Sequence, residues 1–186
     1  MNNIGTLIVI SAPSGGGKTT VIRNLLEIVP DSARLITTTT RAPREGEADA
    51  VDYHFLSKTE FEAKIQKGDF LEYVEYADHY YGTDKHELQS MLERYRYVFA
   101  AVEVRGKKSF ESAGVPMFSI FLKPESMGIL RERLEARTGI SEAVIEERLE
   151  VAAEEIAHAD DYDVVIANRQ GHFEETVRAV VDSLPG

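Results

Sequence analysis

The residues best suited to chemistry lie near the start of the chain, where a glycine-rich run leads into a lysine and two threonines. The run reads Ala12-Pro13-Ser14-Gly15-Gly16-Gly17-Lys18-Thr19-Thr20. Glycines let the backbone curl so that successive amides point at an anion, and a following helix adds partial positive charge. We expect a phosphate-binding loop in which Lys18 neutralises the β- and γ-phosphates of ATP and the Thr19 hydroxyl ligates Mg²⁺.

The segments around this run are those that a P-loop requires. An apolar segment at 6–11 precedes it, and apolar residues with helical spacing follow it from Val21 to Leu26. Ala12 stands where the P-loop pattern usually has its first glycine, which an alanine can replace while its φ stays negative. A glycine-rich turn without a ligand is the plain alternative. The order of strand, glycines, Lys-Thr and helix favours a nucleotide site.

Four apolar segments of strand length, separated by segments with helical spacing, set the fold class. They cover residues 6–11, 97–104, 117–122 and 163–167. Such alternation predicts an α/β protein, here a P-loop three-layer fold with a parallel sheet flanked by helices. Short, nearly all-apolar strands suit a sheet that is covered on both faces.

The stretch from about 37 to 84 differs, because it is rich in Thr and Tyr and its strand candidates at 51–56 and 70–76 are more polar. We interpret it as an inserted lobe. Within it, Ser57 and Glu60 have the spacing of a capping box and Gly68 is a plausible stop, which predicts a short helix over 59–67. Further on, apolar residues in steps of four and three from Ile145 to Ala159 predict one helix over 142–161 with an acidic, solvated face.

Composition excludes several classes of function. The 186 residues suit a single domain, and no apolar run approaches the roughly 18 residues of a membrane span. A net charge of −11 argues against binding to a nucleic-acid backbone. The absence of cysteine excludes disulfides, and the N-terminus lacks the pattern of a signal peptide. We therefore expect a cytoplasmic protein, monomer or homodimer, without a nucleic-acid or membrane partner.

A P-loop alone leaves GTPases, ATPases and kinases open. The run Asn168-Arg169-Gln170-Gly171 does not match the Asn-Lys-x-Asp motif by which GTPases read guanine. The second ligand must therefore be read from the predicted lobe. Its motifs, in order, are Thr37-Thr38-Thr39-Thr40-Arg41-Ala42-Pro43-Arg44-Glu45-Gly46-Glu47, Asp52-Tyr53-His54-Phe55, Phe70-Leu71-Glu72 and Tyr80-Tyr81-Gly82-Thr83.

This order of motifs resembles the guanylate kinase family, and the resemblance runs from about Gly5 to Leu184. It implies a nucleoside monophosphate kinase of purine nucleotide metabolism, which transfers the γ-phosphate of ATP to GMP and dGMP with Mg²⁺ as cofactor. It also implies a core at about 1–36, 85–123 and 160–186, an acceptor-binding lobe at about 37–84 and a lid at about 124–159.

The family roles agree with the chemistry of the lobe's side chains. Two arginines can clamp one phosphate with planar forks of donors while two tyrosine hydroxyls complete the ring, so the acceptor phosphate is assigned to Arg41, Arg44, Tyr53 and Tyr81. A carboxylate suits the N1-H and 2-amino donors of guanine, and a hydroxyl suits O6. We therefore assign the N1-H and 2-amino donors to Glu72, and O6 to the hydroxyls of Thr37 and Thr83.

The predicted lid carries arginines that suit the transferred phosphoryl group. The resemblance assigns transition-state stabilisation to Arg137 and Arg148, with Arg133 beside them. Arginines that merely balance acidic neighbours on a helix surface are the alternative. Asn168, next to the last predicted strand, matches a family asparagine near the adenine.

The chain departs from the family pattern where an Asp-Ile-Asp type sequence usually ends the central strand. Ala101 has no carboxylate, whereas Glu103 keeps one that can accept from the guanine 2-amino group. Glu135 and Glu147 stand where the family often has arginines. These departures leave open a lowered turnover or a modified guanine nucleotide as acceptor. Two further hypotheses are a peptide-binding module without catalysis and a P-loop kinase for a non-nucleotide phosphate.

Overall fold

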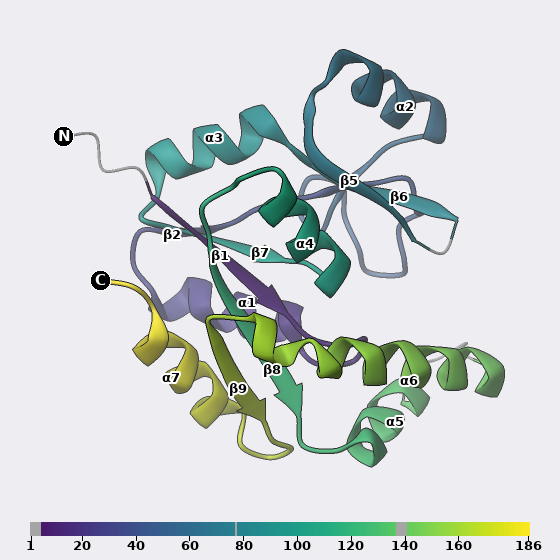
Figure 1. Ribbon diagram of the computed structural model, residues 1–186, viewed down its shortest axis with the longest axis vertical. Coiled ribbons are helices and arrows are strands. Elements are labelled where there is room, and N and C mark those ends of the chain that lie inside the picture. Colours follow the sequence, from purple (N-terminus) through teal and green to yellow (C-terminus); the bar gives the residue numbers. More distant parts are fainter. Residues whose placement is uncertain (1–4, 77, 137–140) are drawn as a thin grey trace. The chain divides into compact units, whose positions relative to one another are not determined.

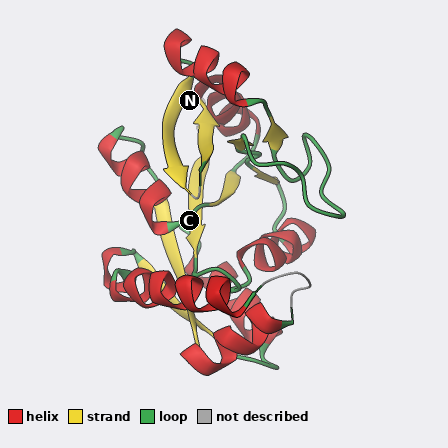
Figure 2. Ribbon diagram, turned by 90° about the vertical axis from the view of Figure 1, so that its right-hand side faces the viewer, coloured by secondary structure: helices red, strands yellow, loops and turns green. Residues whose placement is uncertain are grey.

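The computed structural model describes residues 5–76, 78–136 and 141–186, and it is an α/β protein (Figure 1). Helices flank a sheet of five parallel strands, as the alternating sequence pattern predicts (Figure 2). A second sheet of four strands is built from the stretch that the sequence singles out as a lobe. Of the helices in these described segments, none is long and apolar enough to cross a bilayer.

The parallel sheet has the strand order β2-β7-β1-β8-β9. Its members are β1 (Thr6–Ser11), β2 (Ser32–Arg34), β7 (Tyr97–Ala101), β8 (Phe118–Pro124) and β9 (Val164–Asn168). Four of the five match predicted strands, β1 with the same bounds and the other three with shifted ends. The strand predicted over 97–104 stops at Ala101 because helix α4 (Val104–Ser112) starts three residues later. Strand β2 was not predicted, since its three residues are only half-buried and carry no apolar run.

The smaller sheet has the order β4-β3-β6-β5. Its strands are β3 (Thr38–Thr39), β4 (His54–Phe55), β5 (Phe70–Tyr76) and β6 (His79–Asp84). Strand β5 confirms the prediction over 70–76, but the one over 51–56 shrinks to two residues. The ring of Phe61 stacks on Phe70 and Tyr80 beneath this sheet, with centroids 4.2 and 5.3 Å away.

Helix α2 (Lys58–Lys67) has both of the end signals that the sequence predicts. The Ser57 hydroxyl accepts from the amide of Glu60, and the Glu60 carboxylate accepts from the Ser57 amide at 2.8 Å, which completes the capping box. Gly68 ends the helix with φ 72, a conformation that favours glycine.

By its internal contacts the chain forms two compact units. The first comprises Met1–Leu7, Asp31–Ala100 and Arg105–Met117, so it contains the smaller sheet, α2, α3 (Lys85–Arg94) and nearly all of α4. The second comprises Ile8–Pro30, Ala101–Val104 and Phe118–Gly186. It holds α1 (Lys18–Ile28), α5 (Met127–Glu135), α6 (Glu142–Ala157) and α7 (Phe173–Ser183). The predicted boundaries of core, lobe and lid stay predictions.

In the second unit α5 and α6 lie side by side (Figure 1). Their shared apolar cluster consists of Leu130, Leu134, Ile145, Leu149 and Ala152, three of which belong to the predicted apolar stripe. The prediction of one helix to residue 161 is wrong at its end. Helix α6 stops at Ala157, and a 3-10 turn (Ala159–Asp161) places Ala159 against Phe121 and Tyr162. Burial of Ala159 therefore follows from the turn.

Candidate functional site

The glycine-rich run lies between β1 and α1 and forms a tight loop. Gly15 and Gly17 have φ values of 85 and 87, and residues with a Cβ rarely adopt such backbone conformations. The amide of Gly16 donates to the carbonyl of Pro13 at 2.8 Å, and Gly17 is the N-cap of α1. The loop thus passes directly into the N-terminal turn of a helix, which is the arrangement that binds phosphate.

Ala12 replaces the usual glycine without strain. Positive φ values among the non-glycine residues of the described segments occur only at Asp31, Ala50 and Asp78, so Ala12 keeps an ordinary backbone conformation. The Ala12 side chain does restrict Gly16. A Cβ at Gly16 would lie 2.6 Å from the Ala12 Cβ and 2.8 Å from the Pro13 carbonyl oxygen. Gly16 must therefore remain glycine.

Lys18 and Thr19 lie in the first turn of α1. The Lys18 ammonium donates to the Ala12 carbonyl at 2.5 Å, so it spans the loop from its last residue back to its first. Thr19 and Thr20 are exposed, and the first turn of α1 carries no acidic residue. An anion in the loop would meet backbone amides, a helix N-terminus and this ammonium together.

A hollow of about 620 Å³ lies at the carboxyl ends of β8 and β9 in the second unit. Its lining includes Lys123, Pro124, Ala167, Arg169 and His172. Sequence reasoning left the adenine surface unplaced, and no local signal marks this hollow, because its two walls are 45 residues apart in the chain. We note it as a candidate surface for the nucleotide base.

In the first unit, Arg41 is held in a fixed orientation by Glu47. Its two terminal nitrogens lie 2.9 Å from the two carboxylate oxygens, and its guanidinium lies over the rings of Tyr53 and Phe55 at 5.4 and 5.8 Å. Burial lowers the pKa of Arg41, but hydrogen bonding and charge from Glu47 outweigh that effect and raise it. Arg41 therefore stays charged.

Glu47 is a residue to which the sequence reasoning gave no role. Besides pairing with Arg41, its carboxylate accepts from the amide of Arg44 at 2.7 Å. Burial alone would raise the pKa of Glu47, yet the hydrogen bonds from Arg41 and Arg44 lower it. The two arginines predicted to clamp a phosphate are thus tied to one carboxylate, which fixes the loop that carries them.

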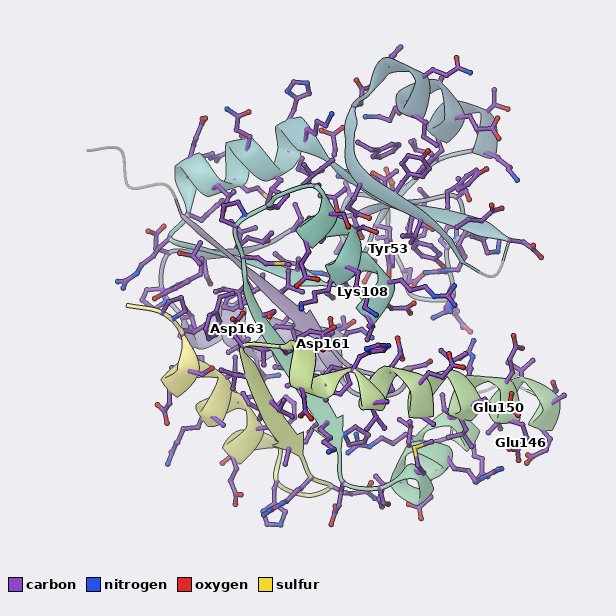
Figure 3. All side chains as sticks on the ribbon, viewed as in Figure 1. Tyr53, Lys108, Glu146, Glu150, Asp161 and Asp163 are labelled. Carbon is purple, nitrogen blue, oxygen red and sulfur yellow. The ribbon has the colours of Figure 1, made fainter. Side chains whose placement is uncertain are left out.

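Two predicted tyrosines meet beside this pair. The rings of Tyr53 and Tyr81 pack edge to face with centroids 6.2 Å apart, and Tyr53 is marked in Figure 3. Tyr53 lies just before β4 and Tyr81 lies on β6, while β3 pairs with both strands. The small sheet therefore brings Arg41, Tyr53 and Tyr81, three of the four residues predicted to bind the acceptor phosphate, into one cluster.

The same sheet joins Glu72 to Thr83. The Thr83 hydroxyl donates to the Glu72 carboxylate at 2.8 Å, and Thr83 is fully buried. Burial raises the pKa of Glu72 to about 7, against the opposing effect of the Thr83 hydrogen bonds. Thr37 directly precedes β3, whose first residue Thr38 pairs with Gly82 on β6, and Glu72 on β5 pairs with Thr83 on β6. Three of the four residues predicted to bind guanine therefore lie on, or directly before, neighbouring strands of this sheet.

Comparisons with known proteins agree with this geometry. A sequence model described as guanylate kinase matches residues 4–185. A guanylate kinase of Rubrobacter xylanophilus is 42% identical over 88% of this chain and 86% of its own. Another, from Aliivibrio fischeri, is 42% identical over 94% and 88%. A crystal structure of guanylate kinase from Anaplasma phagocytophilum superimposes with a TM-score of 0.77, at 30% identity, over 97% of this chain and 84% of that one.

The chain belongs to the guanylate kinase family. This settles the choice among P-loop classes that the sequence left open, and it gives the cluster of Arg41, Tyr53 and Tyr81 and the pair of Glu72 and Thr83 a common context. The residue-level assignments remain our proposals.

The remaining residues predicted from the guanylate kinase resemblance lie in the second unit. Ala101 is the last residue of β7, and Glu103 lies in the short segment between β7 and α4. Arg133 on α5 and Arg148 on α6 are half-buried. Arg137 lies outside the described residues. Asn168, predicted to contact ATP, ends β9 and is bonded to the phosphate loop.

A further arginine, Arg131 on α5, was not predicted to have a role. It pairs with Glu135 on its own helix and with Glu142 and Glu146 on α6, the last of which is marked in Figure 3. The hydrogen bonds with Glu146 and Glu142 raise its pKa. Arg131 thus fits the surface interpretation of lid arginines, since it balances acidic neighbours.

Proposed function

We propose that this protein is an ATP:GMP phosphotransferase, which transfers the γ-phosphate of ATP to GMP and to dGMP and yields ADP and GDP or dGDP. The observation that carries the choice of acceptor is the hydrogen-bonded pair of Glu72 and Thr83. A carboxylate here accepts from the N1-H and 2-amino groups of guanine. Adenine offers neither of these donors, so AMP would leave the half-buried carboxylate without the two partners that guanine supplies, at a cost of about 1–3 kcal/mol or more.

The donor half of the reaction rests on the phosphate loop. Its curled backbone and the N-terminus of α1 receive the phosphates of ATP, and Lys18 neutralises charge at the β- and γ-positions. Mg²⁺ fits this turn, because the exposed Thr19 hydroxyl offers the hard oxygen ligand that the ion prefers. When bound, Mg²⁺ would add positive charge at the transferred group.

The acceptor half binds and orients the GMP phosphate. Arg41 and Arg44 present planar donors from one loop, and the hydroxyls of Tyr53 and Tyr81 complete the ring. Phosphoryl transfer through a loose transition state needs mainly alignment and positive charge. Besides Lys18, we assign the positive charge that stabilises the transition state to Arg133, Arg137 and Arg148. Placement in the cytoplasm and the monomeric or homodimeric state remain predictions of the sequence.

The test is a coupled assay with ATP, Mg²⁺ and a panel of GMP, dGMP, AMP, CMP and UMP. We expect GMP and dGMP to be phosphorylated and the other three to react at least about 10⁴-fold less efficiently, as a site that hydrogen-bonds its ligand can achieve. Preference for AMP would overturn the proposal. Failure of ATP to bind to the folded protein would favour the peptide-binding module instead.

Two variants refine the assay. Glu72→Gln should weaken GMP binding and leave ATP binding intact, with exposed Glu75→Gln on the same strand as the matched control. An unchanged KM for GMP in Glu72→Gln would count against this pocket and favour a non-nucleotide acceptor. Ala101→Asp restores the carboxylate of the family pattern, and a raised kcat would show that the departure at Ala101 limits turnover.

A further inference from the structure

A buried chain of polar groups joins helix α7 to the phosphate loop. The hydroxyl of Thr176 lies 3.3 Å from Oδ1 of Asn168, and the Asn168 amide nitrogen donates to the carbonyl of Gly16 at 2.8 Å. Thr176 and Asn168 are only 2% and 5% exposed. Helix α7 lies along β9 in the second unit (Figure 1), so these three residues connect a helix, a strand end and the loop.

Asn168 also touches the residue that follows Gly16. A Cβ on Gly17 would lie 3.0 Å from the Asn168 amide nitrogen, so the backbone of Gly17 runs directly past this side chain. Gly17 has φ 87 and is the N-cap of α1, one residue before Lys18. The Asn168 amide therefore lies against the two glycines at the point where the loop becomes the helix.

The hydrogen bond to the Gly16 carbonyl also sets the direction of the Gly17 N–H, because both belong to one peptide group. In a planar trans peptide the carbonyl of one residue and the N–H of the next point in opposite directions. Holding the Gly16 carbonyl toward Asn168 therefore turns the N–H of Gly17 to the opposite side. Because two successive glycines meet few steric limits, this peptide would otherwise rotate freely between orientations.

The Thr176 hydroxyl favours the orientation of the Asn168 amide that turns its nitrogen to the loop. A carboxamide has one accepting and one donating end. The Thr176 hydroxyl can donate to Oδ1, and that contact leaves the amide nitrogen directed at Gly16. The carbonyls of Ala167 and His172, each 3.4 Å from this hydroxyl, are alternative acceptors for its single hydrogen, and Oδ1 of Asn168 at 3.3 Å is the nearest of the three.

We propose that Asn168 and Thr176 are positioning residues for the phosphate loop. They keep the peptide between Gly16 and Gly17 in the orientation that presents its N–H to the phosphates of the donor nucleotide. Each polar end of the Asn168 amide makes one contact within the protein, so this positioning role requires no contact with adenine. The inference rests on the proposed function in one respect, since it takes the loop to bind the phosphates of ATP.

The experiment compares ligands that share a base and differ in phosphates. Calorimetry with adenosine, AMP, ADP and ATP is carried out on the full chain and on Thr176→Val, which keeps the shape of the side chain and removes the hydroxyl. We expect the affinity for ADP and ATP to fall roughly tenfold, as for loss of one hydrogen bond of this kind, with adenosine binding unchanged. Thr176→Ser should restore the affinity.

Controls separate positioning from general destabilisation. Ser183→Ala removes another hydroxyl from α7, one that donates to the Val180 carbonyl at 2.7 Å and not to the loop, and it should leave nucleotide binding unchanged. In Thr176→Val the KM for GMP should stay constant. Asn168→Asp replaces the donor to Gly16 with a second acceptor, so it should cost more ADP affinity than Thr176→Val does.

Two results would overturn the inference. An equal loss of affinity for adenosine and for ATP would mean that this chain of residues acts at the base. A Thr176→Val protein that binds ADP like the wild type would mean that Asn168 keeps its orientation without the hydroxyl. Either result leaves the acceptor panel of the wild-type enzyme untouched, so this inference and the proposed function fail separately.

Discussion

The hydroxyl of Thr83 donates to the carboxylate of Glu72 at 2.8 Å inside the smaller sheet, and the burial of this carboxylate governs how the acceptor site should respond to pH. Burial raises the pKa of Glu72 to about 7, so the group that we assign to guanine is partly protonated near neutral pH. Only the carboxylate can accept from both the N1-H and the 2-amino group. Binding of GMP must therefore compete with a proton.

The first prediction concerns GMP affinity as a function of pH. Below pH 7 the dissociation constant for GMP should rise by up to about tenfold per pH unit, because each bound GMP displaces the proton from Glu72. Above pH 7 it should level off. Calorimetry between pH 5.5 and 8.5 measures the profile.

Glu72→Gln is the control for this profile, since the phosphate of GMP itself titrates near pH 6 in both proteins. The ratio of the two dissociation constants isolates the Glu72 contribution. A ratio that stays constant from pH 5.5 to 8.5 would refute the assignment of Glu72 to guanine.

The second prediction concerns stability. Because the pKa of Glu72 in the folded protein lies above its ordinary value of 4.5, the folded state holds this proton more tightly than the unfolded chain. The stabilising contribution is complete below pH 4.5 and is lost as the pH rises to about 7. The free energy of unfolding of Glu72→Gln should therefore increase relative to the wild type across this window. Urea unfolding at pH 5 and pH 7.5 measures it, and an equal difference at both pH values would contradict it.

The third prediction concerns Arg41. A lysine cannot match both oxygens of Glu47 and lie over Tyr53 and Phe55 at the same time, because its charge sits on one nitrogen rather than on a planar fork. Arg41→Lys should raise the KM for GMP by about tenfold or more, the worth of one or two charge-assisted hydrogen bonds. The KM for ATP should not change.

Steady-state kinetics with each substrate in turn makes this measurement. Arg23→Lys, an exposed position on α1, supplies the matched control and should leave both constants unchanged. Equal increases in the KM values for GMP and ATP would indicate general damage to the fold and would speak against a phosphate clamp at Arg41.

The parts of the fold that the sequence predicted are those with local signals. The loop before Lys18, strand β1, strand β5 and the capping box of α2 each carry their pattern within about a dozen residues. The two-residue strand β3 carries none, and it forms where β4 and β6 lie on either side of it. The end of α6 was misplaced because its apolar spacing continues through Ala159, which is buried by a turn instead.

The same distinction holds for the site. Residue types and motif order make Arg41, Tyr53, Tyr81, Glu72 and Thr83 candidates, and the small sheet brings them together in two groups. The hydrogen-bond partners of these residues could not be predicted from residue types and motif order. Thr83 is 11 residues from Glu72, and Asn168 is 152 residues from Gly16. Nor could the raised pKa of Glu72 be predicted, because burial is a property of the folded chain.

The last prediction separates backbone strain from phosphate binding by comparing two glycines with similar φ. Gly17 and Gly114 have φ values of 87 and 69, so alanine at either position should cost about 1–2 kcal/mol of stability through left-handed strain. A Cβ at Gly114 meets nothing within 4 Å, whereas a Cβ at Gly17 lies 3.0 Å from the Asn168 amide nitrogen. Gly17→Ala must therefore push Asn168 aside or shift the loop, and it should lose at least about tenfold in ADP affinity, while Gly114→Ala binds ADP like the wild type. Urea unfolding and ADP calorimetry on the two variants give both quantities. If Gly17→Ala loses stability but keeps full ADP affinity, the orientation of this peptide has no part in binding the donor.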